Sequence, residues 1–420
     1  MNVSSVPSKQ TLQTRCCIVG GGPAGMMLGF LLARAGVDVI VLEKHADFLR
    51  DFRGDTIHPS TLEVMHELGL LDDFLSRPHQ QVRRLRGIIG DTSVVIADFT
   101  RLPTRCQFIA MMPQWDFLDF LLDHARLYPA FRLMMQTEVA ELIEENGRMA
   151  GVKATTPKGA CQIRADLVVG ADGRRSLVRQ LAGLTVDDLG APIDVLWMRL
   201  SRRPSDGEEP MGRVAAGKIF VMIDRGEYWQ CALVIPKGGF DAVRQRGLEG
   251  LRTSIAAIAP DLHDRVHELR DWEDVKLLTV AVDRLRQWHQ PGLLCIGDAA
   301  HAMSPIGGVG INLAIQDAVA AANILAEPLA RRAVSEKHLS AVQARRLFPT
   351  RATQWMQVIV QNRVLSRVLA SRGQLALLWP VRLLGRFSFL QRLPARLVGI
   401  GLRPEHVRTP DILASQQADQ

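Results

Sequence analysis

The feature that most limits the fold of this chain lies in residues 15–25. They read Arg-Cys-Cys-Ile-Val-Gly-Gly-Gly-Pro-Ala-Gly, so a short apolar run leads directly into the pattern Gly20-x-Gly22-x-x-Gly25. An apolar, Ala-rich helix is expected over 26–35, and a second buried strand over 37–42 ends at Glu43. This order of strand, glycine turn, helix, strand and acid predicts a dinucleotide-binding βαβ unit.

Each residue type in the pattern has a physical task. Gly20 permits the tight turn, Gly22 lets the backbone approach a pyrophosphate, and Gly25 lets helix and strand pack closely. The helix start offers free N–H groups and the positive end of its dipole to the phosphates. Glu43 can accept hydrogen bonds from ribose hydroxyls. The alternative is a Gly-rich turn that serves only the fold, and the pattern alone does not distinguish NAD from FAD.

Composition indicates how large a core the chain can bury and in which cellular compartment it lies. With 420 residues, of which 47% are hydrophobic, the chain can bury a large core in two or three structural units. Residues 1–14 are polar, and no uninterrupted run of about eighteen apolar residues appears, so neither a secretory signal nor a membrane span is expected. Six cysteines without CxxC pairs or metal-type clustering indicate reduced thiols. We expect a cytoplasmic protein with no metal site and no nucleic-acid partner.

Three further positions could serve a nucleotide or only the fold. Arg53 lies in a polar loop and is either a solvated charge or a contact to a flavin ring or phosphate. Gln114 precedes a helix expected over 117–127, where it could bind a cofactor or cap the helix. A buried strand runs into Asp172-Gly173 and a basic helix start, which suits phosphate and ribose, although such turns are common.

A second kind of unit interrupts the nucleotide unit. The alternation of apolar and polar residues predicts these segments: a hairpin over 82–99, a three-strand meander over 139–169, strands over 195–200, 219–223 and 228–235, and a charged helical stretch over 241–270. Ser60 or Thr61 is expected to cap the helix that follows it. In the strand that begins at Tyr228, Gln230 and Ala232 share one face with it. Trp229, Cys231 and Leu233 share the other face. One of the two faces must meet something apolar, either core or substrate, and core is the default.

Residues 293–312 form the second decisive stretch. A buried strand ends in Gly297-Asp298, a Pro/Gly loop follows, and a long helix begins near Gly310. Asp298 is therefore expected at the C-terminal end of a parallel strand, where α/β sheets bind ligands. The start of the following helix would direct its N–H groups at a flavin N1–C2=O edge, where negative charge develops on reduction.

The three motifs, in this order and spacing, resemble those of the FAD-dependent aromatic hydroxylases with the p-hydroxybenzoate hydroxylase fold, the class A flavoprotein monooxygenases. The resemblance covers roughly residues 14–330. It implies that Glu43 binds the adenosine ribose, that Asp298 binds the ribityl chain, and that Asp172 with Gly173 serves FAD and NAD(P)H binding.

The same resemblance implies further roles beside the flavin ring. Arg53 and Gln114 are similar to residues near the flavin, and Pro305 to the loop proline beside its C4a position. Three residues are similar to the loop and helix start over the pyrimidine ring: Gly308, Gly310 and Asn312. The implied reaction consumes dioxygen and NADH or NADPH, and the nicotinamide nucleotide binds only transiently. It hydroxylates a hydrophobic aromatic or polycyclic substrate through a flavin C4a-hydroperoxide.

The fold that the resemblance implies is α/β, with a Rossmann-like FAD-binding domain of the GR2 type and an inserted, mostly antiparallel β-sheet substrate domain. We expect the FAD-binding domain in 1–81, 100–182 and 281–330. The substrate domain would take 82–99 with 183–280, and a basic helical region 331–420.

Departures from the family pattern keep other functions open. No convincing general base for a phenol is present, and Tyr228 is the one tyrosine in the expected substrate sheet, which makes it the third catalytic candidate beside Pro305 and Arg53. The segment from Tyr228 to Pro236 is faintly similar to the WxWxIP signature of flavin halogenases, but the second tryptophan is missing, so we reject a halogenase. A flavin reductase of the geranylgeranyl reductase type is the alternative, followed by a non-catalytic binding protein.

The C-terminal region is strongly basic. Residues 331–408 hold fifteen Arg and Lys but only two Glu, a net charge of +13 against +7 for the whole chain. Arginines lie beside Trp, Phe and Leu over 363–396, which suits helices that dock on the protein with their arginines in water. The alternative is that these helices contact the inner membrane surface peripherally, since a lipophilic substrate would be loaded most easily from a bilayer.

Overall fold

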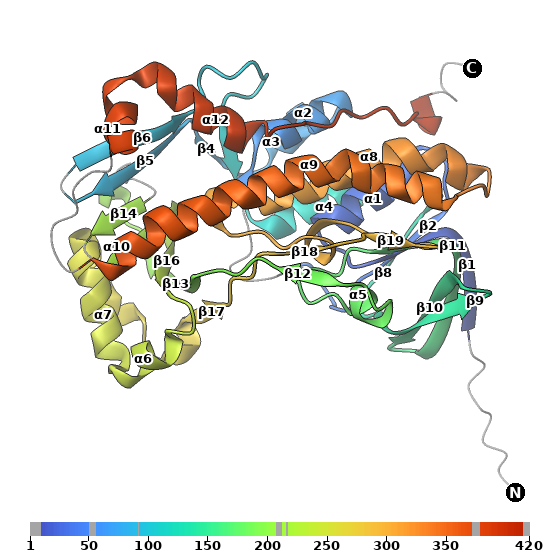
Figure 1. Cartoon of the computed structure of the whole chain (residues 1–420), viewed down its shortest axis with the longest axis horizontal. Helices are drawn as coiled ribbons and strands as arrows, with labels where there is room; N and C mark the ends of the chain where they lie inside the picture. The colour runs from blue at the N-terminus through green and yellow to red at the C-terminus, as the bar shows by residue number, and fades with distance from the viewer. Residues whose placement is uncertain are drawn as a thin grey trace, which may run out of the picture.

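The computed structural model describes residues 10–49, 56–90, 92–206, 212–215, 217–371 and 379–414 (Figure 1). Its central sheet has the strand order β19-β20-β11-β1-β2-β8, and the four neighbouring pairs from β20 to β8 are parallel. The strands are β1 (Gln10–Val19), β2 (Val39–Leu42), β8 (Phe131–Met134), β11 (Gly159–Gly170), β19 (His289–Gln290) and β20 (Leu293–Cys295). Helices cover both faces of this sheet, so its apolar strands are buried on both sides.

Three helices pack on this sheet and against one another. Helix α1 (Pro23–Arg34) packs beside α8 (Gly310–Ala330), and α8 packs along α9 (Glu336–Val360) (Figure 1). The segment Ile306–Ala330 is long and apolar enough to cross a membrane, but 72% of its most apolar window is buried inside the molecule. It is therefore a core helix here. The expected start of this helix near Gly310 is confirmed.

The expected meander is confirmed. Strand β10 (Arg148–Thr156) pairs antiparallel with both β9 (Glu138–Glu145) and β11. Strand β11 also pairs parallel with β1 from Cys161 to Gly170, and its end, from Val168 to Gly170, pairs parallel with β20. One strand thus ties the meander to the nucleotide unit.

A second sheet of seven strands, in the order β17-β13-β16-β15-β14-β5-β6, lies at the other end of the molecule (Figure 1). Its strands are β5 (Arg84–Ile89), β6 (Thr92–Asp98), β13 (Ile193–Ser201), β14 (Gly212–Ala215), β15 (Lys218–Asp224), β16 (Tyr228–Pro236) and β17 (Lys276–Leu278). All its pairs are antiparallel except β14 with β5. This sheet unites the early hairpin with the later strands. The exact boundaries of the two domains remain a prediction.

Two local expectations are corrected. The helical stretch expected over 241–270 consists of α6 (Phe240–Gln245) and α7 (Gly247–Ile258), and beyond Pro260 the chain forms only short 3-10 turns. Neither Ser60 nor Thr61 caps α2 (Pro59–Glu67), because both lie inside that helix and His58 precedes it. Proline at the first helical position explains the earlier start.

The remaining elements complete the molecule. They are a small sheet of β3 (Thr56–Ile57), β4 (Gln80–Val82) and β7 (Ile109–Met111), the pair β12 (Val186–Asp188) and β18 (Asp283–Leu285), and the helices α3 (Leu71–Ser76), α4 (Gln114–Ala125), α5 (Leu177–Leu181), α10 (Ser366–Ala370), α11 (Trp379–Arg386) and α12 (Arg392–Gly399). Helices α11 and α12 lie over the β5–β6 hairpin (Figure 1). From α12 the chain runs back along the molecule as a strap, residues 400–414.

Candidate active site

The carboxyl ends of four neighbouring parallel strands carry the predicted nucleotide motifs. In sheet order, Asp298 follows β20, Asp172 follows β11, the glycine turn from Gly20 follows β1, and Glu43 follows β2. Because parallel strands end at one edge, motifs that are up to 278 residues apart along the chain meet there. The structure thus brings together most of the residues predicted for the cofactor.

The glycine turn has the geometry that a pyrophosphate requires. Gly20 has φ +111°, and a Cβ there would meet the carbonyl oxygen of Ala171 at 2.4 Å. A Cβ on Gly25 would lie 1.9 Å from the carbonyl oxygen of Gly20, so strand and helix could not pack. A Cβ on Gly22, at the N-cap of α1, would meet no protein atom within 4 Å. The helix start is therefore an open cradle with free backbone N–H groups.

Glu43 faces this turn from the next strand. Its Oε2 accepts a hydrogen bond of 3.0 Å from the Gly21 N–H, and its Oε1 accepts one of 3.1 Å from the His45 N–H. These bonds fix the carboxylate beside the glycine turn, and a carboxylate can accept about four hydrogen bonds in all. Glu43 thus has the position and the acceptor capacity that binding an adenosine ribose requires.

The carboxylate of Asp172 bonds to the start of α5, the helix that follows it. Its Oδ1 accepts from the Ser176 hydroxyl at 2.5 Å, and its Oδ2 accepts from the Val178 N–H at 3.1 Å. Burial raises the pKa of Asp172, and these hydrogen bonds oppose that shift. The next residue, Gly173, has φ +84° with open space at its Cβ position. Asp172 therefore shapes the turn that touches Gly20.

Arg174 and Asp298 link two of the motifs directly. Arg174 Nη2 lies 3.6 Å from Asp298 Oδ2, and both side chains are about one-third exposed. Arg174 Nη1 is buried and has no hydrogen-bond partner within the part of the chain that the structure describes. A buried guanidinium N–H without a protein partner among the described residues, at the sheet edge that carries the glycine turn, fits a phosphate group. The residues present at this edge therefore fit a dinucleotide.

A buried ionic chain supports the turn that holds Asp298. Asp317 Oδ2 accepts from the Gly297 N–H at 3.1 Å and from His301 Nε2 at 2.5 Å, and its Oδ1 accepts from Arg346 Nε at 2.9 Å. Burial alone would raise the pKa of Asp317, but His301 and Arg346 together hold it below its usual value. The chain continues from Arg346 to Glu405 on the strap. Sequence inspection did not identify this network.

The proline loop after Asp298 is the second half of the site. Pro305 precedes a short 3-10 turn, Ile306–Gly308, in which Gly307 and Gly308 have φ +77° and +63°. Thr56 Oγ1 donates to the Gly308 carbonyl at 2.9 Å, and a Cβ on Gly308 would collide with it. The side chain of Asn312 accepts from His58 N–H and donates to the Thr56 carbonyl. The side chain of Asn312 therefore holds the segment 56–58 against α8. Its backbone lies in the first turn of α8, next to Gly310.

A series of buried glutamines holds the same loop from α9 and the turn that follows it. Gln354 Nε2 donates to the Ala302 carbonyl, Gln357 Nε2 donates to the carbonyls of Ser304 and Ile306, and Gln361 Nε2 donates to Ser304 Oγ. All three glutamines are at most 2% exposed. Sequence inspection missed them, although their spacing of three and four residues on one helical face was visible.

The remaining predicted residues lie elsewhere. Arg53 falls outside the described residues. Gln114 is the first residue of α4, after the small sheet. Tyr228 begins β16 in the second sheet, where the guanidinium of Arg199 lies 4.9 Å from its ring centroid. The structure therefore does not group Tyr228 with the motifs at the edge of the central sheet.

The second sheet nevertheless presents a chemically distinct face. Trp229, Cys231 and Leu233 of β16 pack into the core with α7, so this is the face for which core, the default expectation, is confirmed. On the opposite face, Gln230 is 4% exposed, its Oε1 accepts from Arg225 Nε at 3.2 Å, and its Nε2 has no partner among the described residues. A buried amide donor on a largely apolar face was not predicted.

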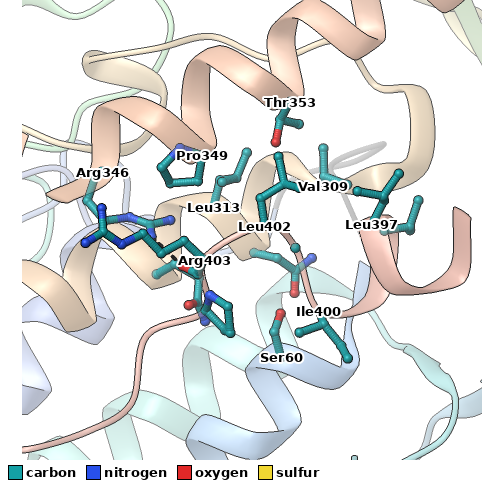
Figure 2. Close-up of a pocket in the computed structure, with 15 residues that line it drawn as sticks. Ser60, Val309, Leu313, Arg346, Pro349, Thr353, Leu397, Ile400, Leu402 and Arg403 are labelled. Carbon is teal, nitrogen blue, oxygen red and sulfur yellow. Dashed lines mark hydrogen bonds between the residues drawn. The ribbon is translucent and has the colours of Figure 1, made fainter. Parts of the chain in front are cut away.

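One small pocket lies beside the start of α8, where Val309 and Asn312 line it (Figure 2). Pro349 and Thr353 of α9 line one wall, and Leu397 of α12 and Leu402 of the strap line another. Arg346 lies at one end of it, and Ser60 of α2 lies below (Figure 2). The pocket marks the joint between the strap and the helices, and it contains no part of the glycine turn.

Comparisons with known proteins agree with this arrangement. The family described as "FAD binding domain" matches residues 13–356. 6-Methylpretetramide 4-monooxygenase of Streptomyces rimosus is 36% identical over 362 residues, which are 86% of each chain. Rifampicin monooxygenase of Streptomyces venezuelae is 30% identical over 311 residues, which are 72% of this chain and 61% of that protein.

A solved structure agrees at the level of the fold. p-Nitrophenol 4-monooxygenase from Pseudomonas putida superposes with a TM-score of 0.72 at 21% identity, over 92% of this chain and 97% of that one. The family match covers the glycine turn, both aspartate motifs and the proline loop. This chain belongs to the FAD-binding-domain family and is an FAD-dependent monooxygenase of the aromatic hydroxylase fold.

Proposed function

We propose that the chain hydroxylates a hydrophobic aromatic or polycyclic substrate that carries a phenol or carbonyl oxygen, at the expense of NAD(P)H and dioxygen. The observation that carries this proposal is the similarity to 6-methylpretetramide 4-monooxygenase, which extends over 86% of both chains. The Nε2 donor of Gln230, buried on the second sheet without a partner among the described residues, supports a substrate that carries an accepting oxygen.

Residues at the edge of the central sheet would hold FAD. The free N–H groups in the first turn of α1 and the guanidinium of Arg174 would bind the pyrophosphate, Glu43 the adenosine ribose, and Asp298 the ribityl chain. FAD, when bound, supplies the activation of dioxygen after reduction by NAD(P)H. The protein's part is to position the ring, exclude water and stabilise charge.

The proline loop and the start of α8 would face the flavin ring. The N–H groups of Gly310 and the next residue have no intrahelical partners, since they belong to the first turn of a 21-residue helix. They would stabilise negative charge at the pyrimidine edge of the ring. The glutamines of α9 keep this loop in one conformation, so Pro305 would present a fixed surface beside the reacting position.

The face of the second sheet that carries Gln230 would hold the substrate. In the strand register, Gln230 lies directly opposite Ile223 of β15 and Arg199 of β13, and Ala232 lies two residues along the same face. An unpaired buried amide costs about 1–3 kcal/mol, which an accepting oxygen of the substrate would offset. A buried amide donor beside Ile223 and Ala232 suits a flat ring system with a phenol or carbonyl group.

The direct experiment follows oxygen from dioxygen into product. Purified holoprotein is screened with phenolic polycycles for stimulated NAD(P)H oxidation, and the best substrate is then incubated under ¹⁸O₂. One labelled oxygen atom per product is expected. Reduction of a C=C bond without label would favour the reductase alternative, and a chain that retains no FAD would contradict the enzyme assignment itself.

A pair of variants tests the substrate face. Gln230→Leu is expected to raise KM about tenfold with little change in FAD content, because it removes one hydrogen bond to the substrate. Gln245→Leu on α6, which lies behind the other face of the sheet, serves as the control and should leave KM unchanged. Equal KM values in both variants would exclude Gln230 from substrate binding.

A further inference from the structure

The segment from α11 to the start of the strap exposes apolar side chains that the fold does not use. Trp379 is 73% exposed, Phe389 62% and Leu393 63%. Three more large apolar side chains of this segment are exposed to a lesser degree: Leu383, Phe387 and Leu402. Scattered exposed hydrophobic residues are ordinary, but six within 24 residues form a concentration that calls for a partner.

All charged side chains of the same segment are positive. Residues 379–404 contain five arginines and neither an acidic residue nor lysine. The arginines are Arg382, Arg386, Arg392, Arg396 and Arg403, all of them exposed. The guanidinium of Arg386 lies 5.9 Å from the ring centroid of Phe387, so charge and aromatic surface are adjacent. The partner must therefore be both anionic and able to accept apolar groups.

The inner side of this segment is already satisfied by the protein. Ala395 and Gly399 of α12 are buried against residues of the β5–β6 hairpin region and α2, where a Cβ on Gly399 would meet Leu102 at 2.9 Å. His58 Nδ1 donates to the Val398 carbonyl at 2.7 Å, and Gln391 Nε2 donates to the Leu384 carbonyl at 2.8 Å. The two helices are thus fixed to the molecule, and the exposed side chains belong to their outer faces.

We propose that this outer surface, the α11–α12 surface, docks on an anionic lipid bilayer. Short helices with arginine beside Trp, Phe and Leu lie in the headgroup region, where the rings and aliphatic side chains enter the acyl boundary and the guanidinium groups meet anionic lipids. A second copy of the chain would bring the same five arginines face to face and would be repelled. An anionic bilayer satisfies both the charge and the apolar side chains.

The surface lies one helix away from the proposed flavin site. A Cβ on Gly307 would lie 3.7 Å from Val398 of α12, and Val398 packs in the same cluster as Ile223 of the second sheet. Helix α12 therefore separates the bilayer from the proline loop and from the substrate face. A lipophilic substrate would have a short path from the membrane to the site, although the docking itself does not depend on the substrate proposal.

Co-sedimentation of the FAD-loaded full chain with vesicles tests the docking. Vesicles of neutral phosphatidylcholine are compared with vesicles that contain phosphatidylglycerol, each at low and high salt. Binding is expected only to the anionic vesicles, with a decrease at high salt because screening weakens the attraction. The absence of sedimentation with anionic vesicles at low salt would overturn the proposal, and so would equal binding to both compositions.

The chain offers a closely matched control variant. Arg392→Glu/Leu393→Ser alters an exposed Arg-Leu pair on the α11–α12 surface, and Arg126→Glu/Leu127→Ser alters an exposed Arg-Leu pair on another element, where Leu127 is also 63% exposed. The first variant should lower the partition coefficient by at least about thirtyfold, since each lost arginine contributes roughly fivefold and the leucine about tenfold. The control should bind like the wild type.

Two further measurements exclude other readings of the result. Both variants should retain wild-type FAD content and wild-type NAD(P)H oxidation in detergent-free solution, because neither pair belongs to the site. Equal losses of vesicle binding in the two variants would overturn the proposal. It would also be overturned if light scattering showed a dimer that Arg392→Glu/Leu393→Ser dissociates, because the surface would then join two copies of this chain.

Discussion

At the scale of single residues, four acidic side chains near the flavin site divide into two groups by their environment. Glu43 and Asp298 are partly exposed at the sheet edge and keep acceptor capacity for ligand hydroxyls. Asp172 and Asp317 are buried, and protein donors occupy their oxygens. The first pair is therefore suited to binding a cofactor, and the second to shaping the turns that present it.

Glu43→Arg should weaken FAD binding by about 1–3 kcal/mol, because it removes the acceptor for the ribose and places a cation where the Gly21 N–H donates. The measurement is the FAD content after dialysis, with the dissociation constant from flavin fluorescence. Asp38→Arg is the control, since Asp38 is exposed near the opposite end of β2. Wild-type FAD content in Glu43→Arg would contradict the role of Glu43.

His58 should make the stability of the protein depend on pH. Burial lowers the pKa of His58 to about 4, and the bond to Val398 opposes the shift only in part. The unfolded chain, with a histidine pKa near 6.5, binds a proton between these values that the folded chain refuses. The free energy of unfolding should therefore fall by about 2 kcal/mol from this group as the pH drops from 7 to 5.

Urea unfolding at both pH values in His58→Gln measures that contribution, because glutamine can donate to the Val398 carbonyl but does not titrate. The difference between the two pH values should be smaller than in the wild type by about 2 kcal/mol. The control variant His267→Gln changes an exposed histidine and should keep the wild-type difference. A wild-type pH dependence in His58→Gln would show that His58 is not held neutral.

At the scale of elements, the sequence predicted what local chemistry determines. The glycine turn, the strand ends at Asp172 and Asp298, and the start of α8 follow from residues close together in the chain. The partners of these elements do not: Asn312 binds the segment 56–61 about 250 residues earlier, and the proline loop is held by glutamines some 50 residues later. Only the folded chain reveals such pairs, because polar residues at helical spacing equally well describe a solvated face.

Gln357→Leu tests whether the proline loop must be held. It leaves the Ser304 N–H and the carbonyls of Ser304 and Ile306 without their partner, so the loop should lose its fixed conformation. We expect kcat to fall about tenfold and the fraction of oxygen released as hydrogen peroxide to rise, with FAD content unchanged. Peroxide is measured against NAD(P)H consumed.

Gln343→Leu provides the matched control for that variant. Gln343 also lies on α9 and also bonds two backbone groups, the Trp288 N–H and the Arg286 carbonyl, but these lie outside the proline loop. It should lower stability without raising the peroxide fraction. If both variants released the same peroxide fraction, the effect would come from the helix as a whole and not from the loop.

At the scale of the whole molecule, the C-terminal strap ties distant elements together. Arg34 of α1 donates to the Thr409 carbonyl, the Tyr128 hydroxyl after α4 donates to Asp411, and Glu67 of α2 accepts from the Val407 N–H. The strap also supplies Glu405 to the buried ionic chain behind the turn of Asp298. The last residues of the chain are thus connected with the cofactor edge through Arg346 and Asp317.

Arg346→Met should reduce the free energy of unfolding by about 3–5 kcal/mol, because it leaves the carboxylates of Asp317 and Glu405 buried without their shared cation. Arg345→Met is the control: Arg345 binds the same Glu405 but is 31% exposed, so its loss should cost about 1 kcal/mol or less. Urea unfolding of the two holoproteins gives the difference.

The pH dependence of that difference identifies its origin. Arg346 helps to hold the pKa of Asp317 below its usual value, so the ionic contribution is present at neutral pH and is lost as the pH falls through the pKa of the folded state. The gap between wild type and Arg346→Met should therefore narrow on acidification below about pH 4, where the unfolded carboxylates take up protons. A difference that stays constant with pH would mean that Arg346 stabilises the strap by packing alone. Equal losses of unfolding free energy in Arg346→Met and Arg345→Met would mean that the buried pair with Asp317 does not connect the strap to the cofactor edge.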